Sequence, residues 1–141
     1  MTDEQLKETQ RRLYDAFSRS DYAVVEEIIS PNMVEHTPPP PGIPQNRDGD
    51  IEWLKQFRLA FPDFRFKAED ISADGNWVWV RGSVTGTHRG NFLGSPATNK
   101  SFKIEFFDEC RYDRKKMVEH WGAVDVGGII QQLGITPMMG G

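Results

Sequence analysis

The sequence has little cysteine, no excess of positive charge and no long apolar runs. Its 141 residues include one cysteine, Cys110, so no disulfide can form within the chain. Acidic residues outnumber basic ones by 21 to 17, and the formal net charge of −4 provides no positive field to hold nucleic acid or an anionic membrane. Residues 1–5 are polar and charged, and apolar runs elsewhere span only a few residues. We therefore expect neither a secretion signal nor a membrane span.

These absences fit a protein of a reducing compartment, and we expect it to be cytoplasmic. The length and an apolar fraction of 38% predict one domain over residues 1–141, with a core large enough to enclose a pocket. The chain has no internal repeat, which excludes a solenoid.

The first half of the chain has helical periodicity. Apolar residues recur at helical spacing in residues 2–17, 20–29 and 48–61, and each of these segments predicts a helix. Residues 37–44 contain five prolines and cannot be helical, because proline lacks the N–H donor and fixes an extended backbone. We interpret them as a stiff loop.

From residue 63 onward the apolar period changes to two, which is typical of strands. Alternation covers residues 63–69, 77–84, 102–112 and 116–125, and a helical turn follows at 129–133. Three helices followed by four hairpin-linked strands predict an α+β domain with helices on one face of an antiparallel sheet.

Asp108 is the anomaly on the third predicted strand. It shares the inward face with Phe106 and Cys110, where an unpartnered carboxylate would be costly to bury. If the hairpin turns at residues 114–115, Asp108 lies opposite Trp121 and within one position of His120. We therefore expect the two side chains to form a hydrogen bond, either directly or diagonally.

Such a pair permits two interpretations. An imidazole tuned by a carboxylate can act as a general acid or base near neutral pH. Alternatively, the two side chains are simply hydrogen-bond partners of each other in the core and act on no substrate. His36, in an extended segment between two helices, is a further candidate, whereas the three histidines lack the close spacing of a metal site, and we expect no metal.

Residues 90–94 suggest a loop with apolar tips, Phe92 and Leu93, which either covers a pocket or packs as an ordinary loop. Phe107 and Trp121 point to the outer face of the predicted sheet. An apolar outer face suits a subunit interface, so we expect a homodimer through it.

Several segments together resemble one family. Residues 61–64, 86–98, 119–121 (Glu119-His120-Trp121) and 131–134 are similar to segments of SnoaL-like polyketide cyclases, within the superfamily of nuclear transport factor 2. The resemblance implies a cone-shaped α+β barrel in which a curved antiparallel sheet is wrapped by three N-terminal helices around an apolar cavity. It also implies a dimer through the outer sheet face.

These cyclases close a polyketide ring by intramolecular aldol condensation, without a cofactor or metal. Their acid–base Asp directly follows the His-Trp pair, where this chain has Gly122, while Asp125 matches a second acidic position. His36 and His120 match pocket-lining histidines. The catalytic candidates are Asp108, His120, His36 and Asp125, and the pocket-lining or lid candidates are Tyr14, Trp53, Phe57, Phe92, Leu93 and Phe106.

The expected function is that of a cofactor-independent cyclase, isomerase or hydrolase acting on a small, largely apolar carbonyl- or epoxide-containing molecule. His120 with Asp108 would be the base, and His36 or Tyr14 the proton donor. A binding module without catalysis is the main alternative, and an interaction role through the outer sheet face is a weaker one. Because Gly122 replaces the usual acid, the sequence leaves open whether the chain is an enzyme, and Gly122→Asp is expected to raise cyclase activity.

Overall fold

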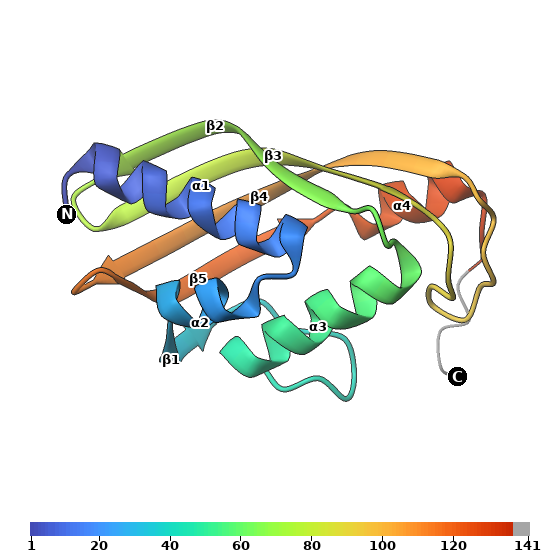
Figure 1. Cartoon of the computed structure of the whole chain (residues 1–141), viewed down its shortest axis with the longest axis horizontal. Coiled ribbons are helices and arrows are strands. Elements are labelled where there is room, and N and C mark those ends of the chain that lie inside the picture. Colours follow the sequence, from blue (N-terminus) through green and yellow to red (C-terminus); the bar gives the residue numbers. More distant parts are fainter. Residues whose placement is uncertain (137–141) are drawn as a thin grey trace.

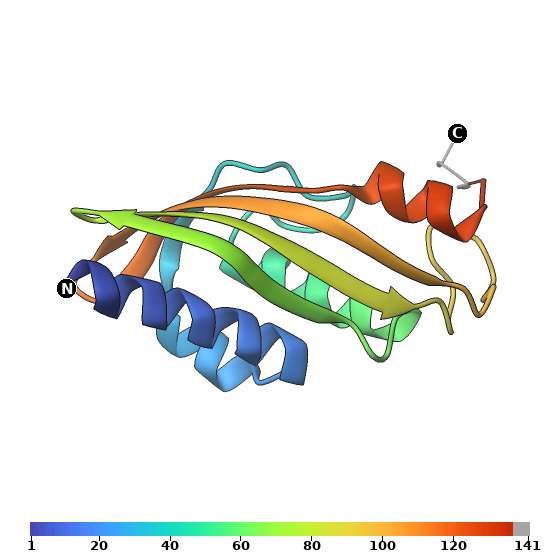
Figure 2. The same ribbon diagram turned by 90° about the horizontal axis from the view of Figure 1, so that it is seen from above.

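A curved five-stranded sheet carries three helices on one face (Figures 1 and 2). The structure, a computed structural model, describes residues 1–136. In chain order the elements are α1 (Asp3–Arg19), α2 (Tyr22–Ile28), β1 (Ile29–Glu35), α3 (Arg47–Ala60), β2 (Arg65–Asp74), β3 (Trp77–Thr87), β4 (Ser101–Asp113), β5 (Lys116–Val124) and α4 (Val126–Leu133). The α+β prediction and its three N-terminal helices are confirmed.

The sheet is mixed, which corrects the antiparallel prediction. Its strand order is β1-β5-β4-β3-β2, and β1 pairs in parallel with β5 through Glu35 and His120. The sequence pattern had assigned Ile29 to the second helix, but it begins β1. Pro31 favours the strand here, because Ser30 before it avoids the helical region, so the helix has to end before Ser30, and an edge strand tolerates the missing N–H donor.

The β4–β5 hairpin turns where predicted, but its register differs by one residue. Tyr112 pairs with Met117, whereas Arg111 pairs with Glu119, so β5 contains one extra residue at this point. Because of this bulge Asp108 lies opposite Gly122 rather than Trp121. His120 nevertheless stays on the inner face with Asp108.

Aromatic side chains fill one end of the space between the helices and the sheet. The ring of Phe61 lies 4.7 Å from Phe57 and 4.9 Å from both Phe92 and Phe102, measured between centroids. Phe92 thus packs into the core, while the neighbouring Leu93 is 37% exposed. Of the two alternatives for residues 90–94, the structure shows ordinary loop packing.

No helix among residues 1–136 has both the length and the apolar character needed to cross a membrane.

Candidate active site

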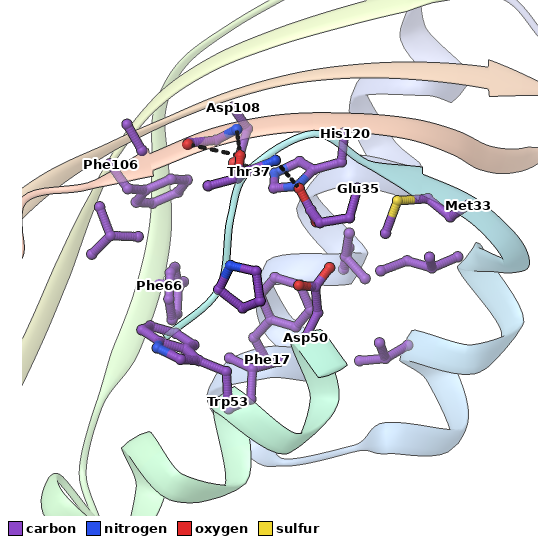
Figure 3. A pocket seen from close by; sticks show the side chains of 18 of the residues that line it. Phe17, Met33, Glu35, Thr37, Asp50, Trp53, Phe66, Phe106, Asp108 and His120 are labelled. Carbon is purple, nitrogen blue, oxygen red and sulfur yellow. Dashed lines mark hydrogen bonds and ion pairs between the residues drawn. The ribbon is translucent and has the colours of Figure 1, made fainter. Parts of the chain in front are cut away.

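A cavity of about 500 Å³ lies between the three helices and the inner face of the sheet (Figure 3). Apolar side chains provide most of its wall, among them Trp53 and Phe106, as predicted. The stiff loop contributes Pro38, Pro39 and Pro40 to the lining. Six polar residues also line the cavity, and they are Gln10, Glu35, Thr37, Asp50, Asp108 and His120.

The predicted pair of Asp108 and His120 faces this cavity. His120 Nε2 lies 2.7 Å from Asp108 Oδ1, and the Tyr14 hydroxyl donates a hydrogen bond to Asp108 Oδ2 at 2.6 Å. Burial, and then the charge of Asp108, raise the pKa of Tyr14 well above its ordinary value, so the hydroxyl stays protonated. Tyr14 therefore lies behind Asp108 and orients it.

Gly122 makes room for this pair. A Cβ atom at this position would lie 2.7 Å from Asp108 Oδ1 and 2.7 Å from His120 Nε2, closer than any side chain can approach. The Asp108 carboxylate thus occupies the space into which a side chain at position 122 would point.

Glu35, which the sequence analysis missed, holds the other side of the His120 ring. Its two carboxylate oxygens lie 2.9 and 2.7 Å from His120 Nδ1, and one of them accepts the backbone N–H of Thr37. Glu35 is 5% exposed and is the last residue of β1. The sequence predicts an extended connection here rather than a strand, so it gives no reason to place Glu35 on the inner face of a sheet.

Asp50 approaches the same cluster from α3, on the opposite side of the cavity (Figure 3). Burial, and then a hydrogen bond to Glu35, raise the pKa of Asp50 to about 8. Burial alone would also raise the pKa of Glu35, but hydrogen bonds from His120 and Asp50 outweigh it and lower that pKa to about 2. At neutral pH, Asp50 is therefore uncharged and Glu35 is ionised.

His120 carries the positive charge of the cluster. Burial opposes its protonation, but the charge and hydrogen bond of Asp108, together with those of Glu35, raise its pKa well above the ordinary value of 6.5. Ligand atoms of Glu35, Asp50 and His120 lie within 4.8 Å of one another, a spacing that a cation can also use. A cation bound by His120 Nδ1 would replace the hydrogen bond of this atom to Glu35. We therefore interpret the cluster as a set of groups that share protons.

Thr37 fixes the start of the proline loop. Its hydroxyl accepts the backbone N–H of Gly122 at 2.7 Å and donates to the Gly122 carbonyl at 3.0 Å. This side chain ties the loop to β5 next to Asp108, and the prolines that follow form the cavity wall.

His36 and Asp125, two predicted catalytic residues, lie outside the cavity. His36 stacks on Trp121 with ring centroids 4.0 Å apart, and its Nε2 lies 2.9 Å from a carboxylate oxygen of Glu119. Neighbouring residues of a strand point to opposite faces, so Glu35 points inward and His36 outward. Asp125 accepts the Gly128 N–H at the start of α4. Neither of these two predicted catalytic residues therefore lines the cavity.

Four predicted lining or lid residues also lie elsewhere. Tyr14 lies behind Asp108 and does not line the cavity. Phe57 and Phe92 belong to the aromatic cluster described above, and Leu93 is at the surface. The predicted lid function of Phe92 and Leu93 is thus corrected, because neither residue lines the cavity.

Replacing Asp50 with asparagine should flatten the pH dependence of stability between about pH 4 and pH 8. The folded-state pKa of about 8 exceeds the ordinary 3.8, so the folded protein keeps a proton that the unfolded chain releases. The unfolding free energy therefore falls as the pH rises through this window, and an asparagine at this position has no such proton to lose. Urea unfolding at several pH values measures the effect, with the exposed Asp48→Asn as the matched control. Equal slopes in wild type and Asp50→Asn would contradict the raised pKa.

Comparison with known proteins agrees with this architecture. The sequence pattern of the SnoaL-like polyketide cyclase family matches residues 7–133. Aklanonic acid methyl ester cyclase DauD from Streptomyces sp. (strain C5) and its counterpart DnrD from Streptomyces peucetius are each 31% identical over 131 residues. These alignments cover 88% of this chain, 78% of DauD and 87% of DnrD.

Solved structures show the same fold. Wild-type IdmH from Streptomyces antibioticus is 32% identical and superimposes with a TM-score of 0.82, covering 92% of this chain and 98% of IdmH. AclR from Streptomyces galilaeus superimposes with a TM-score of 0.84 at 24% identity, and the alignment covers 96% of this chain and 100% of AclR. At this identity the match shows only that the two folds are alike. Together with the curved sheet and the cavity on its inner face, these matches show that the chain belongs to the SnoaL-like polyketide cyclase family.

Proposed function

We propose that the protein closes a ring in a small, largely apolar polyketide-like molecule by a cofactor-independent aldol reaction. The observation that carries the proposal is the Asp108 carboxylate, held by Tyr14 and His120 at the wall of an apolar cavity. The described activity of the curated relatives, aklanonic acid methyl ester cyclases, supports it.

Asp108 is the base in this proposal. A carboxylate has about four lone-pair sites, so Asp108 can accept a proton while it keeps its contacts to Tyr14 and His120. It takes a proton from a carbon next to a carbonyl, and the resulting enolate carbon attacks a second carbonyl of the same molecule. The His120 imidazolium stabilises the negative charge of the site, and the apolar wall limits competition from water.

A binding module remains the second candidate, and one observation favours it. Both oxygens of Asp108 are already hydrogen-bonded, and its side chain is 14% exposed. A pair that only orients a ligand would have the same contacts. Turnover distinguishes the two candidates.

Asp108→Asn and His120→Ala should each reduce ring closure by about 10²–10⁴-fold, the usual cost of losing a positioned acid or base. Affinity for the substrate should change only modestly, because most of the cavity wall is apolar. Steady-state kinetics on a panel of carbonyl and epoxide compounds measures turnover, and Asp74→Asn at the exposed end of β2 is the control. Saturable binding without turnover in the wild type would favour the binding module.

The geometry reverses the expectation for Gly122→Asp. A side chain there displaces the Asp108–His120 pair, so the single variant should lose activity instead of gaining it. Because Asp108 and Gly122 are cross-strand partners, Asp108→Ala combined with Gly122→Asp moves the carboxylate to the facing strand. The double variant removes the contact with Asp108 but keeps the one with His120, so it should recover part of the activity relative to Gly122→Asp alone, measured with the same kinetic assay. A more active single variant would show that the site tolerates both carboxylates.

We also propose a homodimer through the outer face of the sheet. Phe107 and Trp79 are 50% and 40% exposed there, beside Trp121. The apolar groups lie among charged residues of both signs, such as Arg81 and Glu105, which suits contact with a second copy of the same surface.

Phe107→Glu should convert this dimer to monomers, because it places a charge at the centre of the apolar face. Sedimentation at about tens of micromolar measures the mass of wild type and variant. Leu59→Glu, at an exposed position on α3, is the matched control and should leave the dimer intact. A monomeric wild type at this concentration would contradict the proposal.

A further inference from the structure

An aldol closure requires a proton donor as well as a base. The oxygen of the attacked carbonyl becomes an alkoxide, and a donor must face it. His36 and Tyr14 are the donors expected from the sequence, but His36 lies on the outer face and the Tyr14 hydroxyl donates to Asp108. The donor must therefore come from another residue of the cavity wall.

Asp50 has the position that this role requires. Its side chain extends from α3 towards the strands, whereas Asp108 lies on β4 across the cavity (Figure 3). A molecule in the cavity would therefore meet Asp108 from β4 and Asp50 from α3. The charged and titratable groups that face Asp50 are Glu35 from β1, His120 from β5 and Asp108 from β4.

The partners of these carboxyl groups decide which of them keeps a proton. Glu35 receives the His120 ring N–H and the backbone N–H of Thr37, both of which favour its ionised form. Asp50 lies beside Glu35 in the same cluster, and the ring nitrogens of His120 make their hydrogen bonds to Glu35 and Asp108 rather than to Asp50. Two adjacent buried carboxyls resist double ionisation, so the proton stays on Asp50.

We propose that Asp50 is a catalytic residue that donates its carboxyl proton to the alkoxide formed in ring closure. This inference rests on the proposed function. In this proposal the base, Asp108, lies on β4 and the acid, Asp50, lies on α3. Glu35 stays ionised between His120 and Asp50, so that the proton stays on Asp50.

The reaction balances without an added reagent. Asp108 accepts the proton as the carbon–hydrogen bond breaks, and the electron pair of that bond forms the new carbon–carbon bond to the carbonyl carbon. The carbonyl π electrons move to oxygen, which takes the proton of Asp50 and becomes a hydroxyl. The substrate is isomerised, Asp108 has gained one proton and Asp50 has lost one.

One proton must then return from Asp108 to Asp50 before the next turnover. Hydrogen bonds connect Asp108 to His120 and His120 to Glu35, and a carboxylate oxygen of Glu35 lies within 4.8 Å of one from Asp50. This connection runs along the cavity wall and requires no large movement of the chain.

The test is Asp50→Asn, which keeps the size of the side chain but cannot transfer a carboxyl proton. We expect kcat to fall by about 10²–10⁴-fold, with KM changed much less. Wild-type kcat should decline above about pH 8, where Asp50 loses its proton, and the variant should lack this alkaline limb. Asp48→Asn, an exposed neighbour in the same helical turn, is the matched control and should behave as wild type.

A second readout is independent of turnover. The infrared C=O band of a protonated carboxylic acid should be present in the wild type at neutral pH, disappear above about pH 8 and be absent from Asp50→Asn. Asp50→Glu, which restores a carboxyl, should regain both the band and part of kcat.

The outcomes separate this inference from the proposed function. A wild type without turnover on any carbonyl compound would overturn the proposed function and the donor role with it. Turnover that Asp50→Asn retains in full, or a wild type without the infrared band at neutral pH, would overturn the donor role alone. A loss of kcat in Asp50→Asn that leaves the alkaline limb in place would also overturn it, because a purely structural effect would not remove the limb.

Discussion

The His120 imidazole ring, held between two carboxylates, is the interaction on which the rest of the site depends. A charge inside a protein is tolerated only when its partners compensate the lost hydration, and here Asp108 and Glu35 bind the two ring nitrogens. The partners come from β4 and β1, so this ring joins the centre of the sheet to its edge. Loss of either partner would leave an uncompensated charge in the cavity wall.

The same arrangement divides the carboxyl groups into two kinds. Glu35, which contacts the imidazolium, is stabilised as an anion, while Asp50 beside it stays neutral. Acid and base functions can thus arise from identical chemical groups, because their surroundings differ. The apolar remainder of the cavity preserves this difference by excluding the water that would weaken it.

Much of the fold could be predicted from the periodicity of the sequence, and so could two members of the cluster, Asp108 and His120. The alternation around Asp108 placed it on the inner face with His120, and the bulge in β5 changed their register without changing that face. Glu35 escaped prediction because β1 includes a proline and pairs with a strand far along the chain. Asp50 could not be recognised either, since an acid in the first turn of a helix is ordinary and only tertiary packing distinguishes it from Asp48.

The parallel pairing of β1 with β5 also bears on how the protein folds. Glu35 and His120 are 85 residues apart in the chain, so their contact closes a long loop and is entropically slow to form. The helices and the hairpins of β2, β3 and β4 rely on closer neighbours and can form earlier. We therefore expect the buried ionic cluster to assemble late in folding, when β5 docks beside β1.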